Sequence, residues 1–226
     1  MEYKNIVKGE FIKRPNRFIG NVIIDGTECE CHIKNTGRCK ELLVPMAEVY
    51  LEKSNNPNRK TMYDLVSVRK GNRIINIDSQ APNRIFREWA ETAEYFKNIT
   101  QLRREVSFGK SRLDFYIETE SEKIFAEVKG VTLENNDTVS FPDAPTERGV
   151  KHINELIKAK HSGYRAIAVF VVQMDNAKIF VSNDITHPAF GTALREAYKK
   201  GVEILVLGCK VTPNSISAYS TIPFKL

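Results

Sequence analysis

The chain has 226 residues, of which 42% are hydrophobic and 27% are charged, and its net charge is +6. This apolar content suffices for a packed core and excludes a wholly disordered chain. The longest strictly apolar run, residues 166–172, is far shorter than the roughly 20 residues of a membrane span. The start MEYKNIVKGE lacks the apolar core of a signal peptide. We therefore expect a cytoplasmic protein without a membrane partner, and the basic excess favours a polyanion such as nucleic acid.

Residues 1–80 have the pattern of short strands separated by turns. Asp25-Gly26 is a strong hairpin signal between two of these strands. The predicted strands cover residues 18–24, 27–33, 48–51, 64–68 and 74–77. Several short strands with little helix indicate a small β-barrel. An OB-like barrel fits the length, although periodicity alone does not separate it from an SH3-like one. We expect this domain to bind nucleic acid.

Residues 81–226 follow a different pattern, which begins at Ala81-Pro82. Helices are predicted over residues 83–97, 147–161 and 189–200, from apolar residues at helical spacing. Strands are predicted over residues 102–108, 112–118, 123–128, 165–173, 177–182 and 202–208. A three-strand meander before a crossover helix indicates a mixed α/β sheet. The expected fold class is thus α/β (α+β), with a small barrel followed by a mixed-sheet domain.

The four cysteines are Cys29, Cys31, Cys39 and Cys209. Without a secretory signal their thiols should stay reduced. Three of them lie near His32, which suggests zinc, but structural zinc sites usually pair their cysteines as C-x₂₋₄-C. Cys29 and Cys31 would share one face of a strand as small apolar residues. We therefore expect no zinc.

One group of charged residues has a spacing suited to catalysis. Asp114 lies in the second strand of the predicted meander, and Glu127 and Lys129 end the third. Residues two apart in a strand point to the same side, so Glu127 and Lys129 share a face. An antiparallel hairpin can bring Asp114 alongside Glu127. We expect two carboxylates and an ammonium group to converge at a strand end.

This convergence fits metal-dependent phosphodiester hydrolysis. Two carboxylates and a backbone carbonyl supply the hard oxygen ligands that Mg²⁺ prefers. A lysine beside the ion can orient the attacking water and offset charge on the phosphoryl group. The same spacing also fits a simple salt bridge between Lys129 and one of the carboxylates.

Several specific stretches are spread over nearly the whole chain. They are HIKNTGR (32–38), PNR (82–84), SRLDF (111–115), EVKGVTL (127–133), FPDAPTERG (141–149) with KH (151–152), and GVEI (201–204). With the order of elements, these stretches resemble the PD-(D/E)xK nuclease superfamily and, within it, the sugar fermentation stimulation protein A (SfsA) family. Gly130 stands where that family often has Ser, and Pro145 where it often has Val. Neither departure removes an expected ligand.

The resemblance implies an OB-fold domain over residues 1–80, a restriction-endonuclease-like domain over residues 81–226, and DNA binding. It makes Asp114 and Glu127 ligands of Mg²⁺ or Mn²⁺ and Lys129 a catalytic residue. Glu88, in N-R-x-x-x-E, would be an outer acidic residue that holds the metal or its water, with Glu91 as the alternative. The expected partner is nucleic acid, with DNA favoured over RNA. The oligomeric state stays open, with a homodimer as one option.

Four basic residues are candidates for contact with nucleic acid. Arg148 and Lys151 lie near the start of the predicted helix, for which Thr146 fits the N-cap. Arg112 belongs to the SRLDF motif, and Arg38 lies in a turn where a barrel loop can meet nucleic acid. Aromatic side chains that could stack on bases are expected in the core instead. These are Phe11, Phe18 and Tyr50.

Two functions follow from these observations. The first is a DNA nuclease that depends on Mg²⁺ or Mn²⁺, with the barrel as a substrate clamp. The second is a DNA-binding regulator of sugar-metabolism genes that retains the nuclease fold without cleavage. The intact set of Asp114, Glu127 and Lys129 favours the nuclease. A barrel that binds a small sugar or nucleotide effector rests on no motif.

Overall fold

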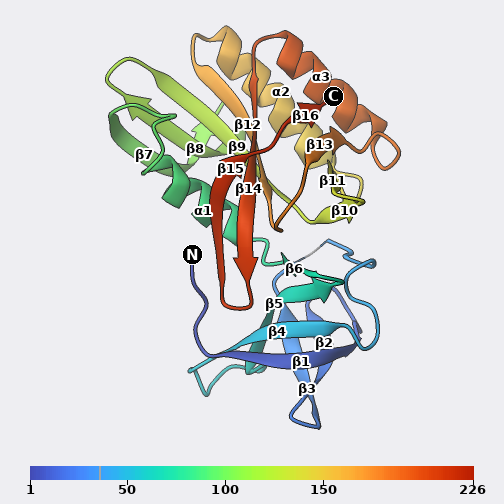
Figure 1. Cartoon of the computed structure of the whole chain (residues 1–226). Coiled ribbons are helices and arrows are strands. Elements are labelled where there is room, and N and C mark those ends of the chain that lie inside the picture. Colours follow the sequence, from blue (N-terminus) through green and yellow to red (C-terminus); the bar gives the residue numbers. More distant parts are fainter. Residues whose placement is uncertain (36) are drawn as a thin grey trace.

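The N-terminal strands of the chain form a closed barrel (Figure 1). The structure is a computed structural model that describes residues 1–35 and 37–226. The strand order is β3-β2-β1-β4-β5-β6, and β3 also pairs with β5, which closes a five-strand barrel. The strands are β1 (Ile6–Lys13), β2 (Ile19–Ile24), β3 (Thr27–Ile33), β4 (Glu48–Lys53), β5 (Tyr63–Lys70) and β6 (Arg73–Asn76). The predicted small barrel is confirmed.

The β2–β3 hairpin follows directly from its sequence. Asp25 and Gly26 have φ values of 50° and 77°, the left-handed conformation that tight hairpin turns require. The prediction missed β1, in which only Gly9 and Phe11 are buried, so that the strand shows little apolar alternation. A Cβ atom at Gly9 would lie 2.8 Å from the carbonyl oxygen of Ile23. Glycine therefore allows β1 to pass close to β2.

A six-stranded sheet forms the centre of the C-terminal domain, in the order β15-β14-β12-β9-β8-β7. β9, β12 and β14 run parallel, whereas β7, β8 and β15 run antiparallel to their neighbours. Helix α1 packs on one face, where Phe86 and Phe115 share a buried cluster. Helices α2 and α3 cover the other face, where Leu156 and Phe190 pack with Phe170. The predicted mixed α/β sheet is confirmed.

These elements have the following bounds. The helices are α1 (Ala81–Ala90), α2 (Glu147–His161) and α3 (Pro188–Lys199). The sheet strands are β7 (Ile99–Phe108), β8 (Ser111–Thr119), β9 (Lys123–Val131), β12 (Arg165–Val172), β14 (Glu203–Thr212) and β15 (Ser215–Thr221). Over the described part of the chain, no helix has both the length and the apolar character to cross a membrane.

Three parts of the prediction need correction. The helix expected over residues 83–97 ends at Ala90, and Phe96 packs edge-to-face on Phe86 from a turn rather than from the helix. A further sheet, in the order β10-β11-β13-β16, contains three strands that the prediction missed. Its strands are β10 (Leu133–Asn135), β11 (Thr138–Phe141), β13 (Ile179–Ser182) and β16 (Phe224–Lys225). β15 was also missed, because it is half-exposed and rich in Ser and Thr.

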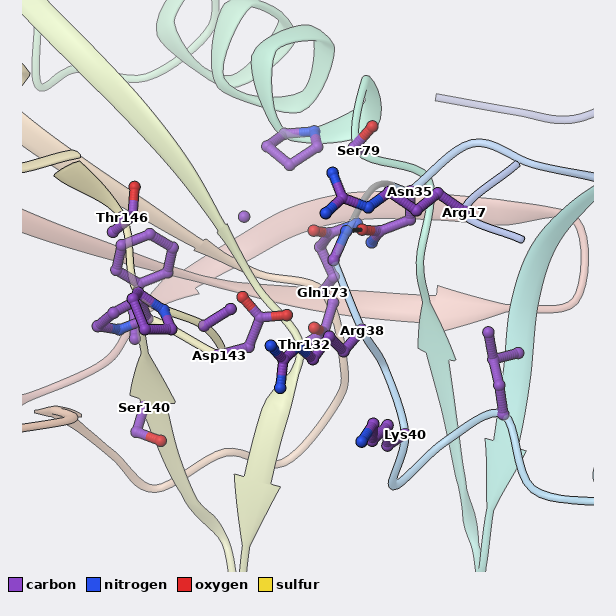
Figure 2. A pocket seen from close by; sticks show the side chains of 18 of the residues that line it. Arg17, Asn35, Arg38, Lys40, Ser79, Thr132, Ser140, Asp143, Thr146 and Gln173 are labelled. Carbon is purple, nitrogen blue, oxygen red and sulfur yellow. Dashed lines mark hydrogen bonds between the residues drawn. The ribbon is translucent and has the colours of Figure 1, made fainter. Parts of the chain in front are cut away.

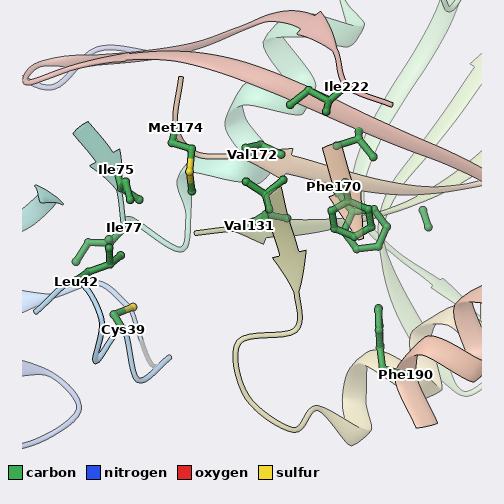
Figure 3. Packing of buried hydrophobic residues seen from close by; sticks show 14 of the residues in the cluster. Cys39, Leu42, Ile75, Ile77, Val131, Phe170, Val172, Met174, Phe190 and Ile222 are labelled. Carbon is green, nitrogen blue, oxygen red and sulfur yellow. The ribbon is translucent and has the colours of Figure 1, made fainter. Parts of the chain in front are cut away.

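The barrel and the second domain meet through one shared core. Figure 3 shows Ile75 and Ile77 of the barrel side close to Met174, Val172 and Val131 of the second domain. The backbone also pairs across this boundary, since the N–H of Asn76 donates to the carbonyl of Gln173 at 2.9 Å. Gln173 Nε2 donates to Asn76 Oδ1, also at 2.9 Å. These contacts hold the barrel against the end of β9 and β12.

Candidate active site

Strand pairing places Asp114 beside Glu127. The β8–β9 ladder ends at the pair Phe115 and Ala126, and Asp114 and Glu127 are the next residues on the two strands, so both carboxylates lie at the same end of the ladder. Asp114 Oδ2 accepts a hydrogen bond from the backbone N–H of Val128 at 2.8 Å. The carboxylate is thereby fixed against the neighbouring strand, as the sequence predicted for this pair.

Glu127 is almost completely buried and has two cationic or polar neighbours. Lys129 Nζ donates to Glu127 Oε1 at 2.6 Å. His152 of α2 bonds the same oxygen through Nδ1. Among the described residues, Glu127 Oε2 has no hydrogen-bond partner although it is buried. One oxygen is therefore anchored, and the other is left available.

His152 is a member of this cluster to which the sequence analysis assigned no role. Its Nε2 accepts a hydrogen bond from Arg148 Nε at 3.4 Å, so the proton lies on Nδ1, which donates to Glu127. The motif K-H at residues 151–152 carried this signal, but only the packing of α2 on β9 brings the ring to the carboxylate. Such a partner fixes the orientation of a ligating carboxylate.

The pKa values of Asp114 and Glu127 are shifted in opposite directions. Burial, together with the neighbouring charge of Glu127, raises the pKa of Asp114 above its ordinary value. Burial also acts to raise the pKa of Glu127, but the hydrogen bond from His152 and the charge of Lys129 outweigh it and lower the pKa. A cation between the carboxylates would relieve their repulsion.

These residues fit a divalent cation with hard oxygen ligands. Besides Glu127 Oε2, the side-chain oxygen of Asn83 is buried and lacks a partner among the described residues. Asn83 also donates from Nδ2 to Asp114 Oδ1 at 3.4 Å. Within residues 1–35 and 37–226, no three His, Cys, Asp or Glu side chains form a metal cage. A site with two carboxylate ligands, in which water fills the other coordination positions of the ion, matches the way proteins bind Mg²⁺.

Glu88 is not brought into this cluster. Its two carboxylate oxygens instead bind the N-terminal ammonium group at 2.7 Å and Arg84 Nε at 2.9 Å. The alternative, Glu91, accepts from Arg87 Nε at 2.9 Å. The α1 residue that faces Asp114 is Asn83, which belongs to the P-N-R stretch. This is a correction to the expected role of Glu88 beside the metal.

A cavity of about 1150 Å³ opens between the barrel and the second domain (Figure 2). Its lining includes Gly130, which directly follows Lys129, and Pro82, which directly precedes Asn83. Among the described residues, the cavity lining therefore adjoins the carboxylate cluster in the chain but includes none of its members. Its charged lining consists of four cationic side chains and one carboxylate, which are Arg14, Arg17, Arg38, Lys40 and Asp143.

The four basic residues predicted to contact nucleic acid have different surroundings. Arg38 lines the cavity. Arg112 lies 3.5 Å from Glu105 on exposed strands, and Lys151 Nζ donates to the carbonyl of Lys110 at 3.2 Å. Arg148 contacts His152 behind the carboxylates. The predicted N-cap of α2 is confirmed, since Thr146 Oγ1 accepts from the N–H of Gly149 at 3.0 Å.

Comparison with known proteins agrees with this architecture. A family model described as the SfsA N-terminal OB domain matches residues 12–77, and one described as the sugar fermentation stimulation protein RE domain matches residues 80–215. Proteins named sugar fermentation stimulation protein homolog, from Ruminiclostridium cellulolyticum and Desulfitobacterium hafniense, are each 54% identical over 226 residues. These alignments cover 100% of this chain and 100% and 99% of the two relatives, respectively.

A solved structure extends the comparison to three dimensions. It is described as Pyrococcus furiosus SfsA in complex with Ca²⁺, and it superposes with a TM-score of 0.91 at 30% sequence identity. The match covers 100% of this chain and 98% of that chain. Both domains, and their arrangement, are therefore shared with that protein. The chain belongs to the sugar fermentation stimulation protein (SfsA) family.

Proposed function

We propose that this chain binds DNA and hydrolyses its phosphodiester bonds with the help of Mg²⁺ or Mn²⁺. The observation that carries the proposal is the geometry of Glu127. His152 and Lys129 hold one of its oxygens, while the other is buried without a partner among the described residues and lies on the strand opposite Asp114. A salt bridge alone would not require a second buried carboxylate with a raised pKa.

Each residue of the cluster has a role in this proposal. Asp114 and Glu127 would hold the ion, with Asn83 beside them to bind the ion or its water. The ion would polarise the phosphoryl group and lower the pKa of a bound water molecule. Lys129 Nζ, half-buried and tied to Glu127, lies where it can orient the attacking water and offset phosphoryl charge.

Two further observations support the proposal. The Ca²⁺ complex of the Pyrococcus furiosus relative supports a site for hard divalent cations in this family. The basic cavity beside the carboxylates supplies charge for a phosphate backbone, and an OB barrel is a frequent platform for nucleic acid. DNA is the favoured polymer, on the resemblance to DNA nucleases.

A cleavage assay with Asp114→Asn tests the proposal. Labelled single- and double-stranded DNA and RNA are incubated without metal and with Mg²⁺ or Mn²⁺. We expect metal-dependent products from the wild type and at least about a 100-fold lower rate from the variant, because it lacks a ligating carboxylate. Asp184→Asn, which removes an exposed carboxylate paired with Arg195, serves as the matched control and should cleave normally.

Two other outcomes would contradict the proposal. Equal metal-dependent cleavage by Asp114→Asn would place the activity outside this cluster. No cleavage by the wild type under any condition, with DNA binding retained by both proteins, would favour the non-catalytic regulator. Thermal melting of both variants confirms that they fold, since Asn at position 114 can still accept the bond from the N–H of Val128.

A further inference from the structure

Three of the four basic side chains that the barrel contributes to the interdomain cavity have no ion-pair partner among the described residues. Arg17, Arg38 and Lys40 line the cavity, and none of them forms an ion pair with any residue that the structure describes. Arg38 and Lys40 are exposed, as is Arg17. Figure 2 shows these three side chains around the cavity, and Asp143 of the second domain reaches the same segment, since its Oδ2 would lie 2.7 Å from a Cβ atom at Gly37. Three unneutralised cations around a cavity favour an anionic ligand.

The backbone around these cations is held in place by Arg14. Its guanidinium donates to four carbonyl oxygens, at distances of 2.5–2.9 Å. These carbonyls belong to Arg17, Asn35, Gly37 and Arg38. Arg14 thus joins the segment after β1 to the segment after β3, and both segments carry cavity cations. The site is built before any ligand arrives, which reduces the ordering that binding requires.

An exposed aromatic side chain, Phe18, directly follows the cavity cation Arg17 in the chain. Phe18 was expected in the core with Phe11 and Tyr50, which are buried, but 53% of Phe18 is exposed. Its N–H donates to Asn16 Oδ1 at 2.9 Å, and its carbonyl accepts from the N–H of Ile33 at 2.7 Å. Asn16 and Arg17, which precede it in the chain, line the cavity, so Phe18 lies at the edge of the lining segment. An exposed ring next to arginines is the arrangement that stacks on an unpaired base.

The size of the cavity discriminates between forms of nucleic acid. A volume of about 1150 Å³ is close to the upper end of the roughly 300–1,000 Å³ of small-ligand pockets, which suits a short stretch of unpaired strand better than the body of a duplex. Asp143 is the one carboxylate among the charged lining residues, and it would repel phosphate but accept a hydrogen bond from a base amino group.

We propose that a single, unpaired strand of nucleic acid passes between the barrel and the second domain on its way to the carboxylate cluster. Its phosphates contact Arg17, Arg38 and Lys40, and one base stacks on Phe18. The proposal rests on the proposed function and adds the form of the substrate. Gly130 and Pro82 line the cavity and adjoin Lys129 and Asn83 in the chain, so the proposed path of the strand continues past them to the cluster.

Binding measured without cleavage tests this proposal. Fluorescence polarisation in EDTA compares a short labelled single-stranded oligonucleotide with the same sequence in a blunt hairpin duplex. We expect the wild type to prefer the single strand. Phe18→Ala should weaken single-strand binding about tenfold or more. In Arg38→Ala/Lys40→Ala, the slope of log affinity against log salt should be shallower by about 1.4, because two phosphate contacts are lost.

Matched controls keep the result specific. Tyr219→Ala removes an aromatic side chain of similar exposure, and Lys199→Ala/Lys200→Ala removes two charges at the far end of α3. Both should bind like the wild type. Duplex binding equal to single-strand binding, or Phe18→Ala and Arg38→Ala/Lys40→Ala matching the controls, would overturn the cavity proposal and leave the nuclease proposal intact. No cleavage by the wild type, with single-strand binding that Phe18→Ala and Arg38→Ala/Lys40→Ala weaken, would contradict the nuclease proposal and leave the cavity proposal intact.

Discussion

His152 and Lys129 share one oxygen of Glu127, and the opposite oxygen is thereby aimed away from both. His152→Ala should therefore lower the affinity for Mn²⁺ by about 10- to 100-fold, because an outer partner no longer orients the carboxylate. Isothermal titration of the metal-free protein measures this change directly. His152→Asn, whose side-chain amide can replace Nδ1–H, should recover part of the affinity.

His161→Ala is the matched control, because His161 lies exposed on the same helix. It should titrate like the wild type. Equal Mn²⁺ affinity for His152→Ala and the wild type would show that the ring supports packing alone and does not position Glu127.

At the residue scale, part of the site could be predicted from sequence. Asp114, Glu127 and Lys129 follow from two-residue alternation in strands and one hairpin register, both of which are local. Glu88 was misplaced because the choice depended on which face of α1 meets β8. Asn83 contacts Asp114, and a residue five positions further lies about 140° around a helix. His152 depends on tertiary packing that no local pattern contains.

At the scale of elements, an ion-pair network fastens the barrel strands. Asp64 of β5 is buried and bonds Arg59 at 2.6 and 3.0 Å, while Lys34, which follows β3, lies 3.1 Å from it. Burial acts to raise the pKa of Asp64, but the hydrogen bonds from Arg59 and the charge of Lys34 outweigh it and lower the pKa to about 2. Because the unfolded value is near 4, ionised Asp64 stabilises the fold above about pH 4 and loses that effect toward pH 2.

Asp64→Asn should lower the free energy of unfolding near neutral pH by about 2 kcal/mol. Its stability should also fall less steeply than that of the wild type as the pH drops from about 5 to about 2. Urea unfolding at a series of pH values checks both effects. Parallel curves for the two proteins over this range would contradict the assignment.

An element was predicted correctly where local sequence signals mark both of its ends. The bounds of α2 were predicted in full, because Thr146 caps one end, Gly163 follows the other, and the apolar stripe is uninterrupted. α1 was predicted too long, because Phe96 continued the helical spacing while packing from a turn. Short, half-exposed strands such as β10 and β16 carry too few residues for any periodicity. Their positions are set by the sheet that they join.

At the scale of the whole molecule, Gln173 links the two domains. It is buried, and its Nε2 donates to Asn76 Oδ1 and to the carbonyl of Asp78. Gln173→Ala should lower the free energy of unfolding by about 1–3 kcal/mol, since buried acceptors lose their donor. The substitution should also uncouple the unfolding of the two domains, so that each unfolds at its own urea concentration. Fluorescence of Trp89, the single tryptophan, reports on the second domain, and far-ultraviolet circular dichroism reports on both.

The two probes should give coincident urea transitions in the wild type and separated ones in Gln173→Ala. Gln101→Ala, at an exposed position of β7, should behave like the wild type. A single coincident transition with an unchanged midpoint in Gln173→Ala would contradict a coupling role for this residue.

The two-part architecture could be predicted from the change of pattern near residue 80, because each domain has its own periodicity. The interdomain cavity could not be predicted. Its lining comes from the segments after β1 and β3, the start of α1, the end of β9 and the loop before α2. The packing of Ile75 and Ile77 against Met174, together with the hydrogen bonds of Gln173, brings these segments together. Such long-range contacts leave no local signal in the sequence.

The most direct test of metal-dependent cleavage at Asp114 and Glu127 is the rate of product formation as a function of Mn²⁺ concentration. A labelled single-stranded DNA is the substrate, and the wild type is compared with Glu127→Gln. The wild type should show a rate that rises with Mn²⁺ and saturates, and Glu127→Gln should give no product above the blank at any concentration. Superimposable curves for the two proteins, or no product from either, would contradict the account.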